Sequence, residues 1–205
     1  HAVFYWGDEN TPLTIVRALH DAYPVGIMAP TSYGLLPLHL ALSSESISFE
    51  IVSFLLETYP KAAFIATCEK SLPLHCAGEC SVRTVRAIID ANPEACQARN
   101  NMKYLPLHLF TLDRASNDAL MLLIKAYPRA LLMKDSRGRT PRQLASIART
   151  KQLLDREELR YKSTRTSRHS SFRRMATAVS TVEDQQPTSS TNEPSQPSSV
   201  VSVED

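Results

Sequence analysis

The sequence predicts an all-α protein of stacked helix pairs joined by hairpin loops, with a disordered C-terminal tail. Three observations support this. The tetrapeptide Leu-Pro-Leu-His occurs three times and a related Thr-Pro-Arg-Gln once, at 36–39, 72–75, 105–108 and 140–143. A second proline precedes the motif proline by 13 residues each time, at positions 24, 60, 93 and 128. Apolar residues recur at equivalent positions between these marks.

The motif prolines mark the start of each helix pair. They are separated by 36, 33 and 35 residues, at Pro37, Pro73, Pro106 and Pro141. Proline is well tolerated in the first turn of a helix, because the N–H that it lacks has no partner inside the helix. We therefore expect a short inner helix to begin at each of these prolines.

A second, outer helix is expected before each of the other prolines. Two apolar columns lie three positions apart, which places them on one helix face. They are formed by Val16, Val52, Val85 and Leu120, and by Leu19, Leu55, Ile88 and Leu123. The following proline then ends the helix. One helix pair of this size cannot bury both of its apolar faces, so the pairs are expected to stack as a solenoid.

Motif, period and helix pattern together resemble the ankyrin repeat, with its period of 33 residues and its T-P-L-H-x-A motif. The resemblance covers roughly residues 11–150. It is closest in DSRGRTPRQLA, where the family's hairpin and helix-start residues are matched by Asp135, Gly138, Thr140 and Pro141.

Two departures from the family pattern affect the turns and the caps. Lys70 and Lys103 stand where the family has its hairpin glycine, so these two hairpins are expected to have looser or altered turns. Leucine replaces the capping threonine in three motifs, at Leu36, Leu72 and Leu105.

We expect the ankyrin-type array to span residues 1–160. It would consist of a partial unit at 1–35 and of units beginning near 36, 72, 105 and 140, the last of which acts as a cap. Leu153, Leu154 and Leu159 among charges indicate a polar-faced capping helix there. The sequence leaves open whether residues 140–161 form one helix or two.

The start of the chain is expected to be a truncated unit. Thr11 and Pro12 are typical of the cap and first turn of an outer helix, which needs an inner partner. Residues 1–7 would be the remnant of that partner, with His1 as the motif histidine and an apolar side chain packed on the outer helix, from Val3, Phe4 or Trp6. The alternative is a disordered leader.

Residues 161–205 have the composition of a disordered tail. The first part is basic, because residues 161–174 hold five Lys and Arg and no acid, and the part from 175 on holds five acids and no Lys or Arg. Such a segment buries too little apolar surface to offset its ordering entropy. Ser170 and Ser171 follow Arg165 and Arg168 at a spacing that basophilic kinases accept. The alternatives are that this basic segment is a nuclear import signal, or that it has neither role.

Composition restricts the class of protein. A hydrophobic content of 43% is typical of a globular chain, and no apolar run reaches the ~18 residues of a membrane span. A net charge of +2 disfavours nucleic acid as the partner. Four cysteines are too few for a disulfide scaffold, so we expect a reducing compartment, cytoplasmic or nuclear, and a monomer.

The stretch SLPLHCAGEC, residues 71–80, brings a histidine and two thiols together and raises the question of a metal site. Cys76 and Cys96 occupy apolar columns, which favours small buried hydrophobes, whereas Cys68 and Cys80 fall in polar columns and are expected to be exposed. No second pair at ligand spacing accompanies Cys76 and Cys80, so we expect neither a metal nor another cofactor. The family resemblance implies that the motif histidines instead bridge adjacent units by hydrogen bonds, at His39, His75 and His108.

No nucleophile in a glycine-flanked turn and no phosphate-cradling loop is visible, so we expect a non-catalytic module. The alternative is a regulatory array from a larger signalling enzyme whose catalytic domain lies outside this chain. In either case the resemblance implies binding of a protein partner through the hairpin fingers and inner helices.

The fingers, 31–35, 67–71, 100–104 and 135–139, carry a basic and aromatic mixture of side chains. Such a mixture suits a protein partner with an acidic surface or an acidic peptide. The candidate contact residues are Tyr33, Glu69, Lys70, Met102, Lys103, Tyr104, Arg137 and Arg139. The alternative is that these side chains only keep the fingers soluble.

Overall fold

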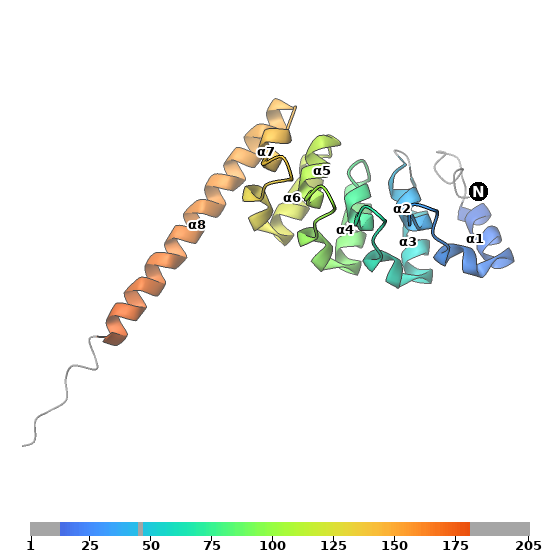
Figure 1. The fold of residues 1–205 in the computed structure, drawn as a ribbon, viewed down its shortest axis with the longest axis horizontal. Coiled ribbons are helices and arrows are strands. Elements are labelled where there is room, and N and C mark those ends of the chain that lie inside the picture. Colours follow the sequence, from blue (N-terminus) through green and yellow to red (C-terminus); the bar gives the residue numbers. More distant parts are fainter. Residues whose placement is uncertain (1–12, 45–46, 181–205) are drawn as a thin grey trace, which may run out of the picture. The chain divides into compact units, whose positions relative to one another are not determined.

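The computed structural model describes residues 13–44 and 47–180, with side chains up to residue 166. All regular structure within these residues is helical, which confirms the predicted all-α class (Figure 1). The chain divides into two compact units, one ending at Ser163 and the other beginning at Thr164. The paired helices belong to the first of these units.

Short inner helices begin at the four motif prolines, as predicted. They are α2 (Pro37–Leu42), η4 (Pro73–Cys76), α5 (Pro106–Leu112) and α7 (Pro141–Leu144), of which η4 is a 3-10 helix. The leucine before three of these prolines has no side-chain acceptor, and the motif histidine supplies the missing cap. Its Nδ1 accepts the leucine N–H at 3.1, 3.1 and 3.2 Å, in His39, His75 and His108. In the fourth copy Gln143 Oε1 accepts the N–H of Thr140 at 2.8 Å.

The outer helices are α1 (Leu13–Ala22), α3 (Phe49–Thr58), α4 (Val82–Ala91) and α6 (Asn117–Ala126). Serine caps three of them by accepting a backbone N–H of the first turn, through Ser48, Ser81 and Ser116. Each outer helix stops two residues before a proline, which opens a 3-10 helix. These are η2 (Pro24–Met28), η3 (Pro60–Phe64), η5 (Pro93–Gln97) and η6 (Pro128–Leu132).

The first predicted apolar column is completely buried, with no exposed area at Val16, Val52, Val85 or Leu120. The second is buried at Leu55, Ile88 and Leu123, but Leu19 is 40% exposed, so the prediction is wrong there. The reason is that α1 packs mainly on η2 and α3, whereas α3, α4 and α6 each also pack on an inner helix. The proposed inner partner of α1, with His1, Val3, Phe4 and Trp6, and the proposed cap at Thr11 and Pro12 lie outside the described residues.

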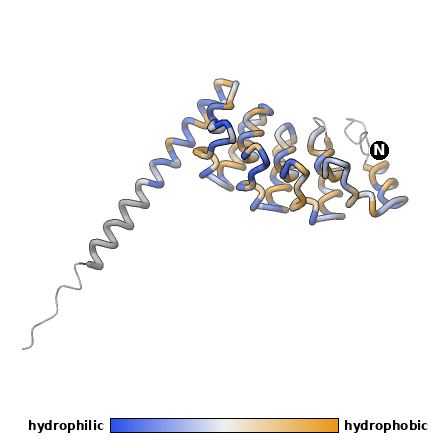
Figure 2. Tube along the Cα trace, in the orientation of Figure 1, coloured by the Kyte–Doolittle hydropathy of each residue, from blue (hydrophilic) through white to orange (hydrophobic). Residues whose placement is uncertain are grey.

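Helix pairs contact their neighbours in sequence order. The outer helices α1, α3, α4 and α6 contact one another successively, and so do the inner helices α2, η4, α5 and α7. Each short helix combines hydrophobic and hydrophilic residues, as expected for elements that bury one face (Figure 2). Every pair from α2 onward is therefore stabilised by its own two helices and by adjacent pairs.

The last helix, α8 (Ala148–Ser180), is separate from α7, which decides between one helix and two for residues 140–161. It extends beyond the expected boundary at residue 160, so the prediction of a disordered tail is wrong for residues 161–180, which are helical. No proline or glycine occurs from residue 142 to 186, and the many Arg, Lys, Leu and Glu residues favour helix. Residues 181–205 lie outside the described part of the chain. Of the helices described, none has the length and hydrophobicity needed to cross a lipid bilayer.

Candidate functional site

The four fingers share one turn geometry. The carbonyl of the first residue accepts the N–H of the fourth at 2.8 to 3.1 Å, and the N–H of the first donates to the carbonyl of the fifth at 2.9 to 3.1 Å. A side-chain oxygen of the first residue also accepts the N–H of the fifth, in Thr31, Thr67, Asn100 and Asp135. Short polar residues that bond their own backbone are typical of such turns, and they fix the shape of each finger.

The fourth residue of every finger has a positive φ. The angle is 75° at Gly34, 56° at Lys70, 58° at Lys103 and 76° at Gly138. The expectation of looser or altered turns at the two lysines is therefore wrong, because the hydrogen bonds keep the same turn in all four fingers. A side chain in this left-handed region costs about 1 kcal/mol relative to glycine, so the lysines hold a conformation that glycine would adopt more easily.

Backbone hydrogen bonds also link each finger to the next. The N–H of the second residue donates to the carbonyl of the third residue in the preceding finger, always at 3.0 Å. The three bonds run from Cys68 to Tyr33, from Asn101 to Glu69 and from Ser136 to Met102. The fingers thus form one continuous edge on which side chains at equivalent positions lie at regular steps.

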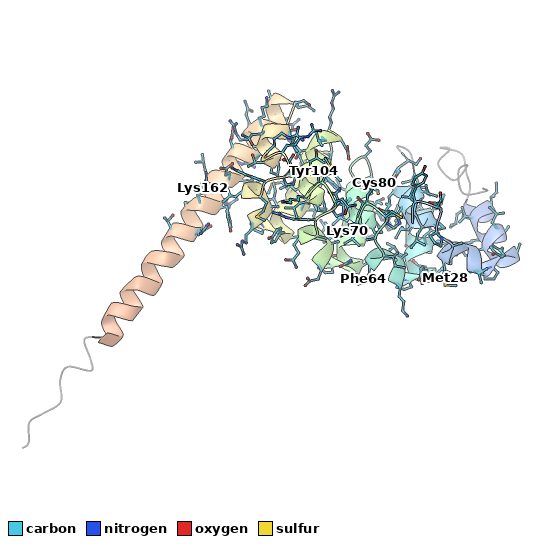
Figure 3. The ribbon with its side chains drawn as sticks, in the orientation of Figure 1. Met28, Phe64, Lys70, Cys80, Tyr104 and Lys162 are labelled. Atoms are coloured by element: carbon cyan, nitrogen blue, oxygen red, sulfur yellow. The ribbon has the colours of Figure 1, made fainter. Side chains whose placement is uncertain are left out.

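Five of the eight predicted contact residues are exposed on this edge without an ion pair among the described residues. Tyr33 is 73% and Met102 40% exposed, and Lys103 and Arg137 are exposed as well. Lys70 is also exposed (Figure 3). Glu69 is exposed too, but Asn101 Nδ2 donates to its Oε2 at 3.3 Å. The exposed set therefore carries three cations, one aromatic ring and one thioether.

Tyr104 and Arg139 serve an internal network instead. Arg139 Nη2 donates to the Tyr104 hydroxyl at 2.8 Å, and its Nε donates to Asp135 Oδ2 at 2.9 Å. Burial alone would raise the pKa of Asp135, but hydrogen bonds from Arg139 and from the backbone N–H of Arg137 outweigh this and lower it. Tyr104 and Arg139 are half-buried, and their hydrogen bond holds adjacent fingers together. Spacing in the sequence does not reveal this role.

Two of the three motif histidines bond a backbone carbonyl of the segment that leads from their own helix pair to the next inner helix, whereas the bridge between adjacent units that the resemblance implied stays a prediction. His75 Nε2 lies 3.3 Å from the carbonyl oxygen of Tyr104, and His108 Nε2 lies 3.2 Å from that of Met133. Because Nδ1 accepts a backbone N–H, the proton must be on Nε2, which donates to these carbonyls. His39 Nε2 is buried and has no direct hydrogen bond within the described residues.

Burial lowers the pKa of all three motif histidines, and that of His39 falls to about 4. The charged form is doubly disfavoured, since a protonated Nδ1 would face the N–H that it now accepts. These histidines are neutral structural groups rather than proton-transfer groups at neutral pH.

The thiols of SLPLHCAGEC are also largely structural. Burial raises the pKa of Cys76, and burial with nearby Cys76 and Glu79 raises that of Cys80 to about 12. Cys80 was expected to be exposed, but it is 8% exposed, and its thiol donates to the Leu42 carbonyl at 3.4 Å. In the described residues, no group of three or more His, Cys, Asp or Glu side chains is arranged to hold a metal ion.

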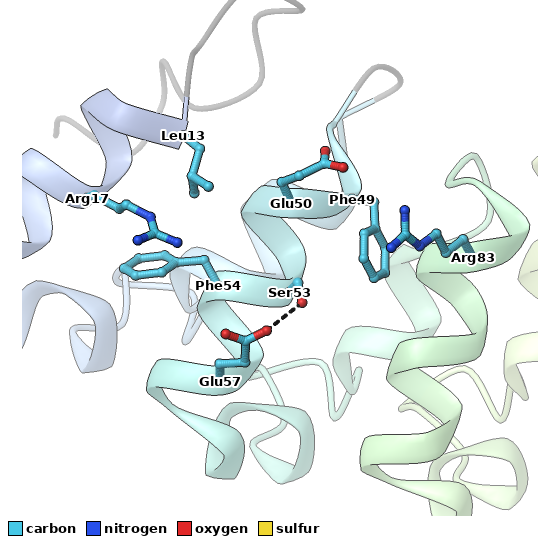
Figure 4. A pocket seen from close by; sticks show the side chains of 8 residues that line it. All are labelled: Leu13, Arg17, Phe49, Glu50, Ser53, Phe54, Glu57 and Arg83. Atoms are coloured by element: carbon cyan, nitrogen blue, oxygen red, sulfur yellow. Dashed lines mark hydrogen bonds between the residues drawn. The ribbon is translucent and has the colours of Figure 1, made fainter.

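A shallow groove of about 200 Å³ lies on the outer helices α1, α3 and α4 (Figure 4). Arg17 stacks on the Phe54 ring at 5.3 Å and Arg83 on the Phe49 ring at 3.7 Å, measured from the guanidinium carbon to the ring centroid. Ser53 donates to Glu57 at 2.7 Å between them. No motif in the sequence indicates this groove, because its residues come from three outer helices of different helix pairs. Its rings are already covered by arginines of the same chain, which makes it less available than the fingers.

Ser170 and Ser171 lie within the backbone of α8, and their side chains are outside the described residues. No family model matches the chain, and no curated protein matches it.

Proposed function

We propose that this chain is an ankyrin-type solenoid that acts as a non-catalytic protein-binding module, with the finger edge as its contact surface. The observation that carries the proposal is that one set of finger residues holds the turns while a different set is exposed to solvent. Backbone bonds and short polar side chains hold the turns. The Tyr33 ring and the Met102 thioether are exposed to solvent. The three exposed cations make no ion pair within the described residues, so all five side chains are available to a partner.

The chemistry of these side chains favours a protein with an acidic surface. Aromatic and methionine side chains supply apolar contact area, and they are common at interface centres. Basic residues around them attract carboxylates and speed up association. A prearranged edge also lowers the entropic cost of binding, because the fingers need no ordering when the partner arrives.

The test compares two triple variants of the immobilised full chain. One replaces Tyr33, Met102 and Arg137 on the fingers by alanine. The other replaces Phe64, Met28 and Arg129, which match them in type and are exposed on the 3-10 helices. We expect proteins captured from cell extract by the native chain to be lost with the finger variant and kept with the control. Equal capture by both variants would contradict the proposal.

A further inference from the structure

Three non-glycine residues in the described part of the chain have a positive φ, and two of them, Lys70 and Lys103, lie on the fingers, whereas Arg114 does not. Lys70 and Lys103 occupy the fourth position of neighbouring fingers, with φ of 56° and 58°. Gly34 and Gly138 occupy the same position in the first and last fingers. Strained backbone conformations cluster at functional sites, because selection for stability alone would replace them. A role for the two ammonium groups themselves accounts for lysine at both positions.

The spacing of these charges follows from the packing of the helix pairs. Lys70 precedes the pair η4 and α4, and Lys103 precedes the pair α5 and α6. The outer helices α4 and α6 are in contact, and packed helices lie about 8–10 Å apart. The bond from Asn101 N–H to the Glu69 carbonyl ties the two finger tips together. The lysines therefore present two cations about 8–10 Å apart. On the next finger Gly138 holds the equivalent position, and Arg137 precedes it by one residue.

Among extended peptide conformations, this step between the two lysines matches polyproline II. A polyproline II helix has three residues per turn and rises about 3.1 Å per residue, so every third side chain lies on the same face about 9 Å further on. In a β-strand successive side chains alternate between faces, so residues three apart point in opposite directions. An acidic peptide in the polyproline II conformation therefore places carboxylates three residues apart opposite the two lysines.

We propose that the finger edge binds an acidic peptide in the polyproline II conformation, with carboxylates three residues apart facing Lys70 and Lys103. This rests on the proposed function and specifies the partner of the same edge. Tyr33 and Met102 flank the two lysines and contact the residues between the acids, and proline is a suitable residue there because it favours this conformation.

The test uses two synthetic peptides of identical composition and the full chain. One contains four repeats of Glu-Pro-Ser, and the other has the same residues with the four glutamates contiguous. Fluorescence anisotropy is expected to show tighter binding of the periodic peptide by about fivefold or more, as two exposed ion pairs allow. Equal affinity for the two peptides, or binding of neither, would overturn the proposal. Neither result decides the proposed function, which the capture experiment tests separately.

A double variant, Lys70→Gly and Lys103→Gly, separates binding from folding. Glycine relieves the positive φ, so the variant keeps its fold and is expected to lose the preference for the periodic peptide. The matched control is Lys134→Gly, which removes an exposed lysine beside the last finger that has no positive φ. It is expected to retain the preference. An unchanged preference in the double variant, or an equal loss in the control, would show that the two finger lysines do not recognise the spacing of the carboxylates in the peptide.

Discussion

At the scale of single residues, the motif histidine performs two functions that a sequence pattern does not separate. Its Nδ1 caps its own inner helix, and in His75 and His108 its Nε2 bonds a backbone carbonyl of the segment before the next inner helix. The capping function needs the neutral ring, because a protonated Nδ1 cannot accept a hydrogen bond, whereas Nε2–H is a donor in either form. Burial enforces the neutral state, and the fourth copy keeps only the capping function by using Gln143, which does not titrate.

Acidification is therefore expected to destabilise the fold through the histidines. The pKa of His39 is about 4 in the folded state and 6.5 as its ordinary value. The unfolded chain binds the extra proton between these values, so stability is complete above pH 6.5 and falls as the pH drops toward 4. At 1.36 kcal/mol per pH unit the loss from His39 alone is up to about 3 kcal/mol. Urea unfolding across this window measures it. His39→Gln should keep the cap and flatten the slope, and an unchanged slope would contradict the assignment.

The positive φ of Lys70 and Lys103 gives a second prediction at the scale of single residues. Lys103→Gly should raise the free energy of unfolding by about 1 kcal/mol, because glycine adopts the φ of 58° without strain. Lys134→Gly, where φ is not positive, should lower it slightly through the greater freedom of the unfolded chain. Chemical denaturation of both variants gives the comparison. A loss of stability in Lys103→Gly would mean that the lysine side chain itself contributes to the fold.

At the scale of elements, local signals predicted helices well and contacts between elements poorly. Prolines gave the helix starts, and the first apolar column is buried as expected. Three features needed the structure. The left-handed turns at Lys70 and Lys103 are held by hydrogen bonds within the finger, the Cys80 thiol is covered by the carbonyl of Leu42, and Arg139 is engaged by Tyr104. Each depends on a partner from another part of the chain or on backbone bonds that composition does not encode.

The serine caps are the element-scale feature most open to test. Ser116 Oγ accepts the N–H of Ala119 at 3.2 Å at the start of α6. Ser116→Ala removes that acceptor and should cost about 1 kcal/mol of stability. Ser136→Ala, on an exposed finger, is the matched control and should be nearly neutral. Thermal unfolding of the two variants distinguishes them, and equal melting temperatures would exclude a capping role.

At the scale of the whole molecule, the first compact unit is stabilised by contacts between successive helix pairs and is closed at its end by α8. Thr150, Leu153, Leu154 and Glu157 from the first turns of α8 are all less than 10% exposed. Arg142 of α7 also binds Asp155 of α8 through two side-chain nitrogens. The beginning of α8 is thus part of the packed unit, and the unit ends at Ser163.

Two truncations test where the folded unit ends. A chain ending at Ser163 retains the buried residues of α8 and should unfold at nearly the same temperature, in one transition, as the full chain. A chain ending at Ile147 loses Leu153 and Leu154, which are 9% and 1% exposed. Burial of one such side chain contributes about 1.5–3 kcal/mol, so this truncated chain should be less stable by about 3–6 kcal/mol. Calorimetry of the three chains gives both comparisons. A large loss on ending at Ser163 would show that residues beyond it stabilise the fold, and equal stability of both truncations would show that α8 is not the cap of the last helix pair.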